Sequence, residues 1–183
     1  MVNEGASAAL DPQVRYSLYR LIYSGCFSPI TIGHMDLIQR ASGLCDELLV
    51  AVLNSGSKDL DLTLEDRKLL VERAIDCQGL SHKVRVISFD GLLADLYREE
   101  KAQAVVRGLR SPMDYDYEVP MVAINRELNP DFETIFLQAK PELAHVSSSL
   151  IREMRRLDQD YQNWLPPGVY ELLQTCLSKG ERG

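Results

Sequence analysis

Long hydrophobic runs and an excess of positive charge are both missing from this sequence of 183 residues. No apolar stretch approaches the roughly 20 residues that a membrane-spanning helix needs, so we expect no membrane partner. The formal net charge is −7, whereas proteins that bind nucleic acid usually present a basic face to the phosphates. We therefore expect no nucleic-acid partner, and an anionic substrate can bind only where cations gather locally.

Closely spaced cysteines are missing as well. The four cysteines, Cys26, Cys45, Cys77 and Cys176, are scattered along the chain, without the short spacing of metal or redox sites. This spacing predicts reduced thiols and a cytoplasmic protein. The first residues lack the basic and then apolar order of a secretory signal. We expect residues 1–17 to be a flexible extension and residues 18–183 to form one domain.

Apolar runs that are typical of buried strands alternate with helical patterns along the chain. We expect strands at Leu18–Tyr23, Leu48–Leu53, Val84–Phe89, Ala104–Val106 and Thr134–Leu137. We expect helices at Met35–Leu44, Thr63–Cys77, Leu92–Lys101, Asp114–Leu128, Ser147–Leu157 and Gly168–Leu177. The alternation predicts an α/β fold: a Rossmann-like, doubly wound parallel five-stranded sheet with helices on both faces and a C-terminal helical extension. Pro120 falls inside one helical pattern and is expected to kink or restart that helix.

Four short segments suited to binding phosphate each follow a predicted strand. They are Cys26–His34 with its Thr-x-Gly-His element, Asn54–Lys58, Arg107–Arg110 and Val146–Ser149. Because the carboxyl ends of parallel strands meet at one edge of a sheet, we expect the four segments to converge on one crevice. Together they supply one histidine, one lysine, two arginines and the unpaired N–H groups of helix N-termini.

Each segment also has an ordinary structural interpretation. Gly-His turns are common, and Lys58 taken alone is more typical of a solvated surface than of a phosphate site. The arginines of Arg107–Arg110 can pair with nearby acids such as Asp114 or Asp116. Ser147 can act as a simple helix N-cap. The expected convergence of the four segments is therefore a stronger argument for a phosphate site than any one segment alone.

The order and spacing of these segments resemble bacterial phosphopantetheine adenylyltransferases over nearly the whole chain, from Leu21 to Leu177. The Thr-x-Gly-His element alone marks the wider nucleotidyltransferase superfamily, whereas the combination of segments is far more specific. The stretches that carry the resemblance are Ser28–His34, Ser57-Lys58, Thr63–Arg67, Arg107–Arg110, Asp114–Glu118, Asn125–Pro130 and Ser147–Leu150.

The resemblance implies transfer of an adenylyl group from ATP to 4′-phosphopantetheine, with Mg²⁺ on the ATP phosphates and no metal ligand from the protein. It also implies a homohexamer and feedback inhibition by coenzyme A. His34 would stabilise the transition state at the α-phosphate. The acceptor would contact Cys26, Lys58, Leu92, Leu93 and Arg107. ATP would contact Cys26, Phe27, His34, Gly108, Leu109, Arg110, Glu118, Leu143, Ala144, His145, Val146, Ser147, Ser148 and Ser149.

Several residues near the expected site depart from the family pattern. Cys26 stands where the family has a threonine whose hydroxyl contacts the acceptor phosphate, and a thiol is a much weaker donor. Ser28 replaces an aspartate and Ile32 an asparagine, while Leu143 and His145 stand where aromatic residues are frequent. These departures motivate one alternative, a weakly active relative that binds coenzyme A or ATP. A second alternative is a nicotinate or nicotinamide mononucleotide adenylyltransferase, which shares the opening segment up to His34, although Arg107–Arg110 and Asp114–Glu118 argue against it.

Overall fold

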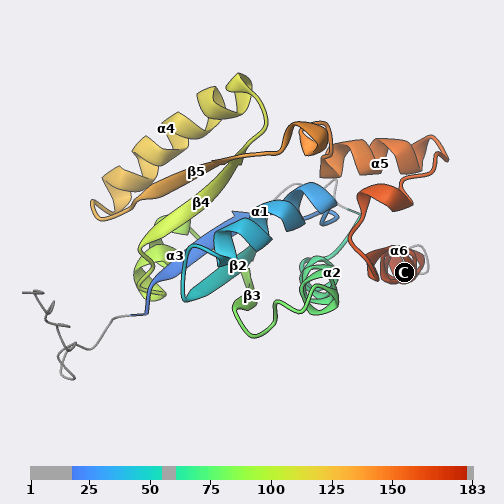
Figure 1. Ribbon diagram of the computed structural model, residues 1–183, viewed down its shortest axis with the longest axis horizontal. Coiled ribbons are helices and arrows are strands. Elements are labelled where there is room, and N and C mark those ends of the chain that lie inside the picture. Colours follow the sequence, from blue (N-terminus) through green and yellow to red (C-terminus); the bar gives the residue numbers. More distant parts are fainter. Residues whose placement is uncertain (1–17, 55–60, 181–183) are drawn as a thin grey trace, which may run out of the picture.

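The described part of the chain, residues 18–54 and 61–180 of the computed structural model, is built around one parallel sheet (Figure 1). Its strands are β1 (Arg20–Gly25), β2 (Glu47–Leu53), β3 (Val84–Phe89), β4 (Ala104–Leu109) and β5 (Thr134–Gln138). They lie in the order β3-β2-β1-β4-β5, and every pair is parallel. The predicted doubly wound five-stranded sheet is therefore confirmed.

Helices cover both faces of this sheet. They are α1 (Ile32–Ser42), α2 (Leu64–Cys77), α3 (Leu93–Glu99), α4 (Pro112–Leu128), α5 (Ser148–Arg156) and α6 (Val169–Gly180), with short 3₁₀ helices at Pro141–Leu143 and Gln162–Trp164. On one face, a large core packs α1, α2 and α6 against the strands. On the other face, a smaller core packs α3 against β1, β2 and β4. The expected C-terminal extension is formed by α5 and α6, and α6 lies beside α2 (Figure 1).

The register of the strands explains the two cores, because alternate side chains of a strand point to opposite faces of the sheet. Tyr23 on β1 lies opposite Val50 on β2 and Val106 on β4, and all three belong to the core beneath α1 and α2. Ile22 and Val105 pair in the same ladder and belong to the core beneath α3. Buried apolar side chains on both faces are the pattern expected of a parallel strand covered by helices.

Three local predictions need correction. The first strand begins at Arg20 rather than Leu18, and Leu18 is about half exposed (48%). β4 continues to Leu109, so Arg107 to Leu109 belong to the strand instead of following it. α4 runs unbroken through Pro120, whereas a kink or a restart was expected, so the helix does not restart there. Pro120 is exposed on this helix, where water can satisfy the carbonyl group that loses its N–H partner.

Candidate active site

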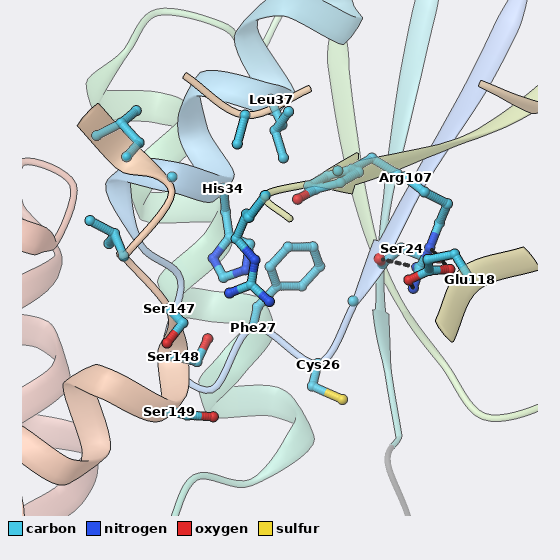
Figure 2. A pocket seen from close by; sticks show the side chains of 18 residues that line it. Ser24, Cys26, Phe27, His34, Leu37, Arg107, Glu118, Ser147, Ser148 and Ser149 are labelled. Atoms are coloured by element: carbon cyan, nitrogen blue, oxygen red, sulfur yellow. Dashed lines mark hydrogen bonds and ion pairs between the residues drawn. The ribbon is translucent and has the colours of Figure 1, made fainter. Parts of the chain in front are cut away.

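A cavity of about 300 Å³ opens at the carboxyl edge of the sheet, between β1 and β4 (Figure 2). The chain passes from β1 to β2 on one side and later to β4 on the other, so the strand order reverses here. In an open α/β sheet this reversal leaves the crevice where ligands bind. The walls come from the end of β1, the first turn of α1, the end of β4 and the start of α5. Three of the four predicted phosphate-binding segments are thereby brought together.

His34 lies in this cavity and is fixed by the N-terminus of its own helix. Thr31 caps α1, and its side-chain oxygen accepts the His34 backbone N–H at 3.4 Å. In return the Thr31 backbone N–H donates to His34 Nδ1 at 3.1 Å. Because a backbone N–H can only donate, Nδ1 is an acceptor, and the neutral ring carries its proton on Nε2.

The protonation of His34 is controlled by its surroundings. Burial, aided by the positive charge of Arg110, lowers the pKa of His34 to about 4. At neutral pH the imidazole is therefore uncharged, and Nε2–H is its one donor. A neutral N–H of this kind can donate a hydrogen bond to a phosphate oxygen and stabilise the negative charge that develops on it.

The turn that follows β1 packs behind this histidine. Phe27 is almost fully buried and has a positive φ of 48°, which is uncommon for a residue with a side chain. Its ring meets the rings of Tyr23 and His34 edge to face, with centroid distances of 5.7 and 5.2 Å. Next to it, Cys26 is exposed at the mouth of the cavity and has a free thiol (Figure 2). The packed Phe27 ring therefore holds His34 in place while the Cys26 side chain stays accessible.

Arg107 at the end of β4 is held in a fixed orientation by two partners (Figure 2). Its Nε and Nη2 donate to the two carboxylate oxygens of Glu118 at 2.8 and 2.5 Å. Its Nη1 donates to the carbonyl oxygen and the hydroxyl oxygen of Ser24 at 3.0 and 3.2 Å. A bidentate carboxylate contact of this kind is strong and directional. The paired interpretation of the arginines is thus correct for Arg107, although its partner is Glu118 and not Asp114 or Asp116.

Arg110 is also paired, but less tightly. Its Nε and Nη2 lie 3.2 Å from the two carboxylate oxygens of Asp114, and its backbone N–H donates to the same side chain at 2.7 Å. The side chain of Arg110 is exposed and lines the cavity. An exposed pair of this type contributes little to stability, so a polyanionic ligand can compete with Asp114 for the guanidinium.

Three serines form the wall opposite Arg107 (Figure 2). Ser147 is the N-cap of α5, as its ordinary interpretation predicts, and accepts the backbone N–H of Leu150 at 3.1 Å. Ser148 donates to the carbonyl oxygen of Pro29 at 2.8 Å, which ties α5 to the turn after β1. Ser149 Oγ accepts a hydrogen bond from Arg152 at 3.2 Å. The start of α5 therefore presents both hydroxyl groups and unpaired N–H groups to the cavity.

One functional position, Arg67 on α2, was missed by the sequence interpretation. Its side chain is 2% exposed, and Nη1 donates to the carbonyl oxygens of Cys26 and Leu53 at 2.7 and 2.8 Å. Arg67 thus joins the ends of β1 and β2 beneath the cavity. The signal was its spacing, because Arg67 shares a helical face with the buried residues Leu70 and Val71.

A second cavity, of similar volume and more apolar, adjoins the first between α3 and α4. Leu92 and Leu93 line it, as do Leu53 and Met121. Arg107 and Glu118 line both cavities, so this ion pair stands at the boundary between them. The pair can therefore contact one ligand that extends from the polar cavity into the apolar one.

Comparison with known proteins identifies the family of this chain. The Cytidylyltransferase-like family model matches residues 22–154. A phosphopantetheine adenylyltransferase from Alkaliphilus oremlandii is 40% identical over 152 residues, covering 83% of this chain and 95% of that protein. One from Clostridium perfringens is 39% identical over 157 residues, covering 86% and 94%. This chain belongs to the phosphopantetheine adenylyltransferase family.

Solved structures add evidence for the fold alone. A candidate nicotinate-nucleotide adenylyltransferase from Vibrio parahaemolyticus superposes with a TM-score of 0.64 at 22% identity, covering 87% of this chain and 93% of that one. A bifunctional NMN adenylyltransferase/ADP ribose pyrophosphatase from Francisella tularensis gives 0.66 at 13% identity, covering 91% and 51%. At these identities the likeness supports the Rossmann-like nucleotidyltransferase fold and no choice of acceptor.

The predicted site residues fall into four groups according to which cavity, if any, they line. Those that line the first cavity are Cys26, Phe27, His34, Arg107, Gly108, Arg110, Glu118, Leu143, Val146 and Ser147 to Ser149. Leu92 and Leu93 line the second cavity. Leu109, Ala144 and His145 line neither of the two, and the exposed His145 instead lies edge-on to Trp164 with ring centroids 6.1 Å apart. Lys58 lies outside the described residues.

Two further properties of the described residues concern membranes and metal ions. None of their helices is both long and apolar enough to cross a membrane. Among the same residues, no three His, Cys, Asp or Glu side chains gather as a metal site would require.

Proposed function

We propose that this protein transfers the adenylyl group of ATP to 4′-phosphopantetheine, giving dephospho-coenzyme A and pyrophosphate. An oxygen of the acceptor phosphate attacks the α-phosphorus in line, the bond from that phosphorus to the β-phosphate oxygen breaks, and pyrophosphate leaves. No covalent enzyme intermediate is needed. The observation that carries the proposal is the Arg107–Glu118 pair at the boundary of a polar and an apolar cavity.

The acceptor combines an anionic phosphate with a pantetheine arm, which matches a polar cavity next to an apolar one. Its phosphate would lie at Arg107, beside Cys26 and the predicted Lys58, while its pantetheine arm would lie against Leu92 and Leu93 in the apolar cavity. Arg107 is already oriented by Glu118 and Ser24. Because the Arg107 side chain is already ordered, binding of the acceptor costs less conformational entropy.

ATP would occupy the polar cavity. His34 would donate from Nε2 to the α-phosphate, and Arg110 together with Ser147 to Ser149 would hold the remaining phosphates. Gly108, Leu109, Glu118 and the segment from Leu143 to Val146 would contact the nucleoside. Fixed donors stabilise the charge that spreads over the phosphate oxygens in the transition state. Mg²⁺ would enter as part of the MgATP substrate, held by the phosphates.

The test is to supply MgATP with one acceptor at a time and to measure pyrophosphate release. We expect turnover with 4′-phosphopantetheine and none with nicotinate or nicotinamide mononucleotide. Turnover with a mononucleotide alone would assign the other adenylyltransferase activity. Tight binding of ATP or coenzyme A without pyrophosphate release would identify a binding protein instead of an enzyme.

Assembly, regulation and location extend the same proposal. We propose a homohexamer of two trimers, because α4 carries exposed apolar side chains along its length, including Met113 at 79% and Tyr117 at 71% exposure.

Coenzyme A contains the pantetheine and adenylate parts of the product and would inhibit by occupying both cavities. Addition of coenzyme A to the acceptor assay tests this inhibition. The use of ATP and the free thiols favour a cytoplasmic location.

A further inference from the structure

Tyr23 is a polar residue of the first cavity to which the family resemblance gives no role. It lies on β1, is 5% exposed and lines the cavity. Its ring meets Phe27 edge to face, so the position of the phenol is set by packing. Packing accounts for the position of the ring, but it gives the hydroxyl group no hydrogen-bond partner.

The Tyr23 hydroxyl has no hydrogen-bond partner within the described part of the chain. A second buried tyrosine provides the contrast. The Tyr97 hydroxyl donates toward the carbonyl oxygens of Gln103 and Asp131, at 3.0 and 2.9 Å. Buried tyrosine hydroxyls usually find such partners, because an unpaired polar group loses its hydration without compensation. The unpaired hydroxyl of Tyr23 therefore faces a cavity that the protein leaves for a ligand.

The surroundings of Tyr23 favour an anion as that ligand. Burial raises the pKa of the Tyr23 phenol, and the positive charges of Arg107 and Arg110 offset only part of this effect. The hydroxyl therefore keeps its proton at neutral pH and can donate. Glu118 and Asp114 pair with the same two arginines, yet both arginines line the cavity and can also contact phosphate oxygens there.

The register of the sheet indicates which of the two substrates is involved. Tyr23 and its ladder partner Val106 point to the face covered by α1, the helix that carries His34. Arg107 is the next residue on β4 and reaches α4 on the other face through Glu118. The acceptor side of the site is thus on the face away from Tyr23, and the nucleotide side is on the face that Tyr23 shares with His34.

We propose that Tyr23 is a further substrate-binding residue, whose hydroxyl donates a hydrogen bond to an anionic oxygen of the phosphate chain of ATP. This inference rests on the proposed function, since it takes MgATP as the occupant of the polar cavity. The assignment makes Tyr23 a partner of His34 on the nucleotide rather than a plain core aromatic residue. Its contribution is binding and orientation, because a phenol that keeps its proton does not exchange one with the substrate.

Tyr23→Phe is the direct test, because it removes the hydroxyl and keeps the ring that packs on Phe27. We expect the dissociation constant of MgATP, measured by calorimetry, to rise about tenfold, the loss typical of one hydrogen bond to a charged group. The Michaelis constant for 4′-phosphopantetheine should change less than twofold. The melting temperature without ligand should stay the same or rise, because no hydrogen bond within the protein is lost.

Tyr97→Phe is the matched control. It removes a hydroxyl that is bonded within the protein, so the melting temperature should fall while the MgATP dissociation constant stays unchanged. An unchanged MgATP affinity in Tyr23→Phe would overturn the inference, and so would a weakening confined to the acceptor. If the wild type binds MgATP but fails to use 4′-phosphopantetheine, the proposed function fails, while the calorimetric comparison still decides the role of Tyr23.

Discussion

The imidazole of His34 is held as a neutral donor by the same contacts that begin α1. Its Nδ1 accepts the Thr31 backbone N–H, so helix capping uses one edge of the ring, and the proposed contact with the α-phosphate would use the other. A capping box normally places Glu or Gln at this third helical position. Histidine fills the capping role here and leaves Nε2–H for a ligand, which explains why a Thr-x-Gly-His element suits a phosphate site.

His34→Ala should therefore lower turnover by about a hundredfold or more, which matches the loss of one preorganised transition-state donor at about 2.7–4 kcal/mol. The MgATP affinity should change much less. Steady-state kinetics with a separate calorimetric titration measures both effects. His82→Ala is the control, because His82 is exposed on the turn before β3. An unchanged turnover number in His34→Ala would contradict the assignment.

The pKa of His34 gives a pH prediction with a definite sign. The unfolded chain binds a proton at His34 near pH 6.5, whereas the folded protein does so only near pH 4. Between these values the unfolded state holds more protons, so stability should fall as the pH drops from 6.5 toward 4. Urea denaturation at pH 7 and pH 5 should show a larger loss for the wild type than for His34→Gln. NMR should show that the His34 ring becomes protonated only near pH 4.

Cys26 should be replaceable without loss. Its thiol is exposed at the cavity mouth, where a hydroxyl would be the stronger donor to a phosphate. Cys26→Thr should leave kcat/KM for the acceptor equal or higher, and it should remove inhibition by a thiol-alkylating reagent. The exposed Cys77 makes Cys77→Ser the control, which should leave that inhibition in place. A large loss of activity in Cys26→Thr would mean that the thiol has a role of its own.

At the scale of elements, the strand ends beneath the cavity are joined by a buried cation. Arg67 reaches from α2 to carbonyl oxygens at the ends of β1 and β2, and burial lowers the pKa of its guanidinium. Burial of a charge is unfavourable unless hydrogen bonds compensate for the lost hydration. The two carbonyl contacts supply part of that compensation and fix the turn that carries Cys26.

Arg67→Met should lower the free energy of unfolding by about 1–3 kcal/mol, because two buried carbonyl groups lose their donor. It should also lower kcat/KM, since the turn after β1 loses its tie to β2. Denaturant titration and steady-state kinetics measure the two effects. Arg73→Met, an exposed change on the same helix, should alter stability by no more than about 0.5 kcal/mol. Equal stabilities of the two variants would refute the bridging role of Arg67.

At the scale of the whole molecule, charge and apolar surface are unevenly distributed. The chain carries a net charge of −7, yet the cavity is lined by Arg107 and Arg110. Both arginines are paired with carboxylates from α4, so this helix offsets the positive charge inside an acidic protein. Exposed apolar side chains run along α4 from Met113 to Leu128, as expected of a surface that packs against another protomer.

Val119→Glu should therefore lower the mass of the assembly measured by sedimentation equilibrium. Val119 is 40% exposed on α4 and does not line the apolar cavity between α3 and α4. A buried charge at a contact between protomers is strongly unfavourable without a partner. Leu157→Glu, at the exposed end of α5, is the control and should leave the mass unchanged. An unaltered mass in Val119→Glu would exclude this part of α4 as an interface.

Local patterns were sufficient for most of the elements. The prediction for the third strand, Val84–Phe89, matched β3 residue for residue, and Thr63, the predicted start of the second helix, is the N-cap of α2. The ends of strands were harder to predict, because no local sequence pattern distinguishes the last residues of β4 from a loop that follows the strand. The pairing of β4 with β5 is what extends the strand to Leu109.

Local patterns in the sequence predicted the α/β fold, the edge of the sheet at which the cavity opens, and most of the residues that line this cavity. These follow from local periodicity and from the rule that ligands bind at the carboxyl ends of parallel strands. Only the tertiary structure decided which charges are paired, which hydroxyls are satisfied and which cation is buried. Such facts depend on contacts between residues far apart in the chain, as in Arg67 with Cys26 or Arg107 with Ser24, and no local pattern encodes them.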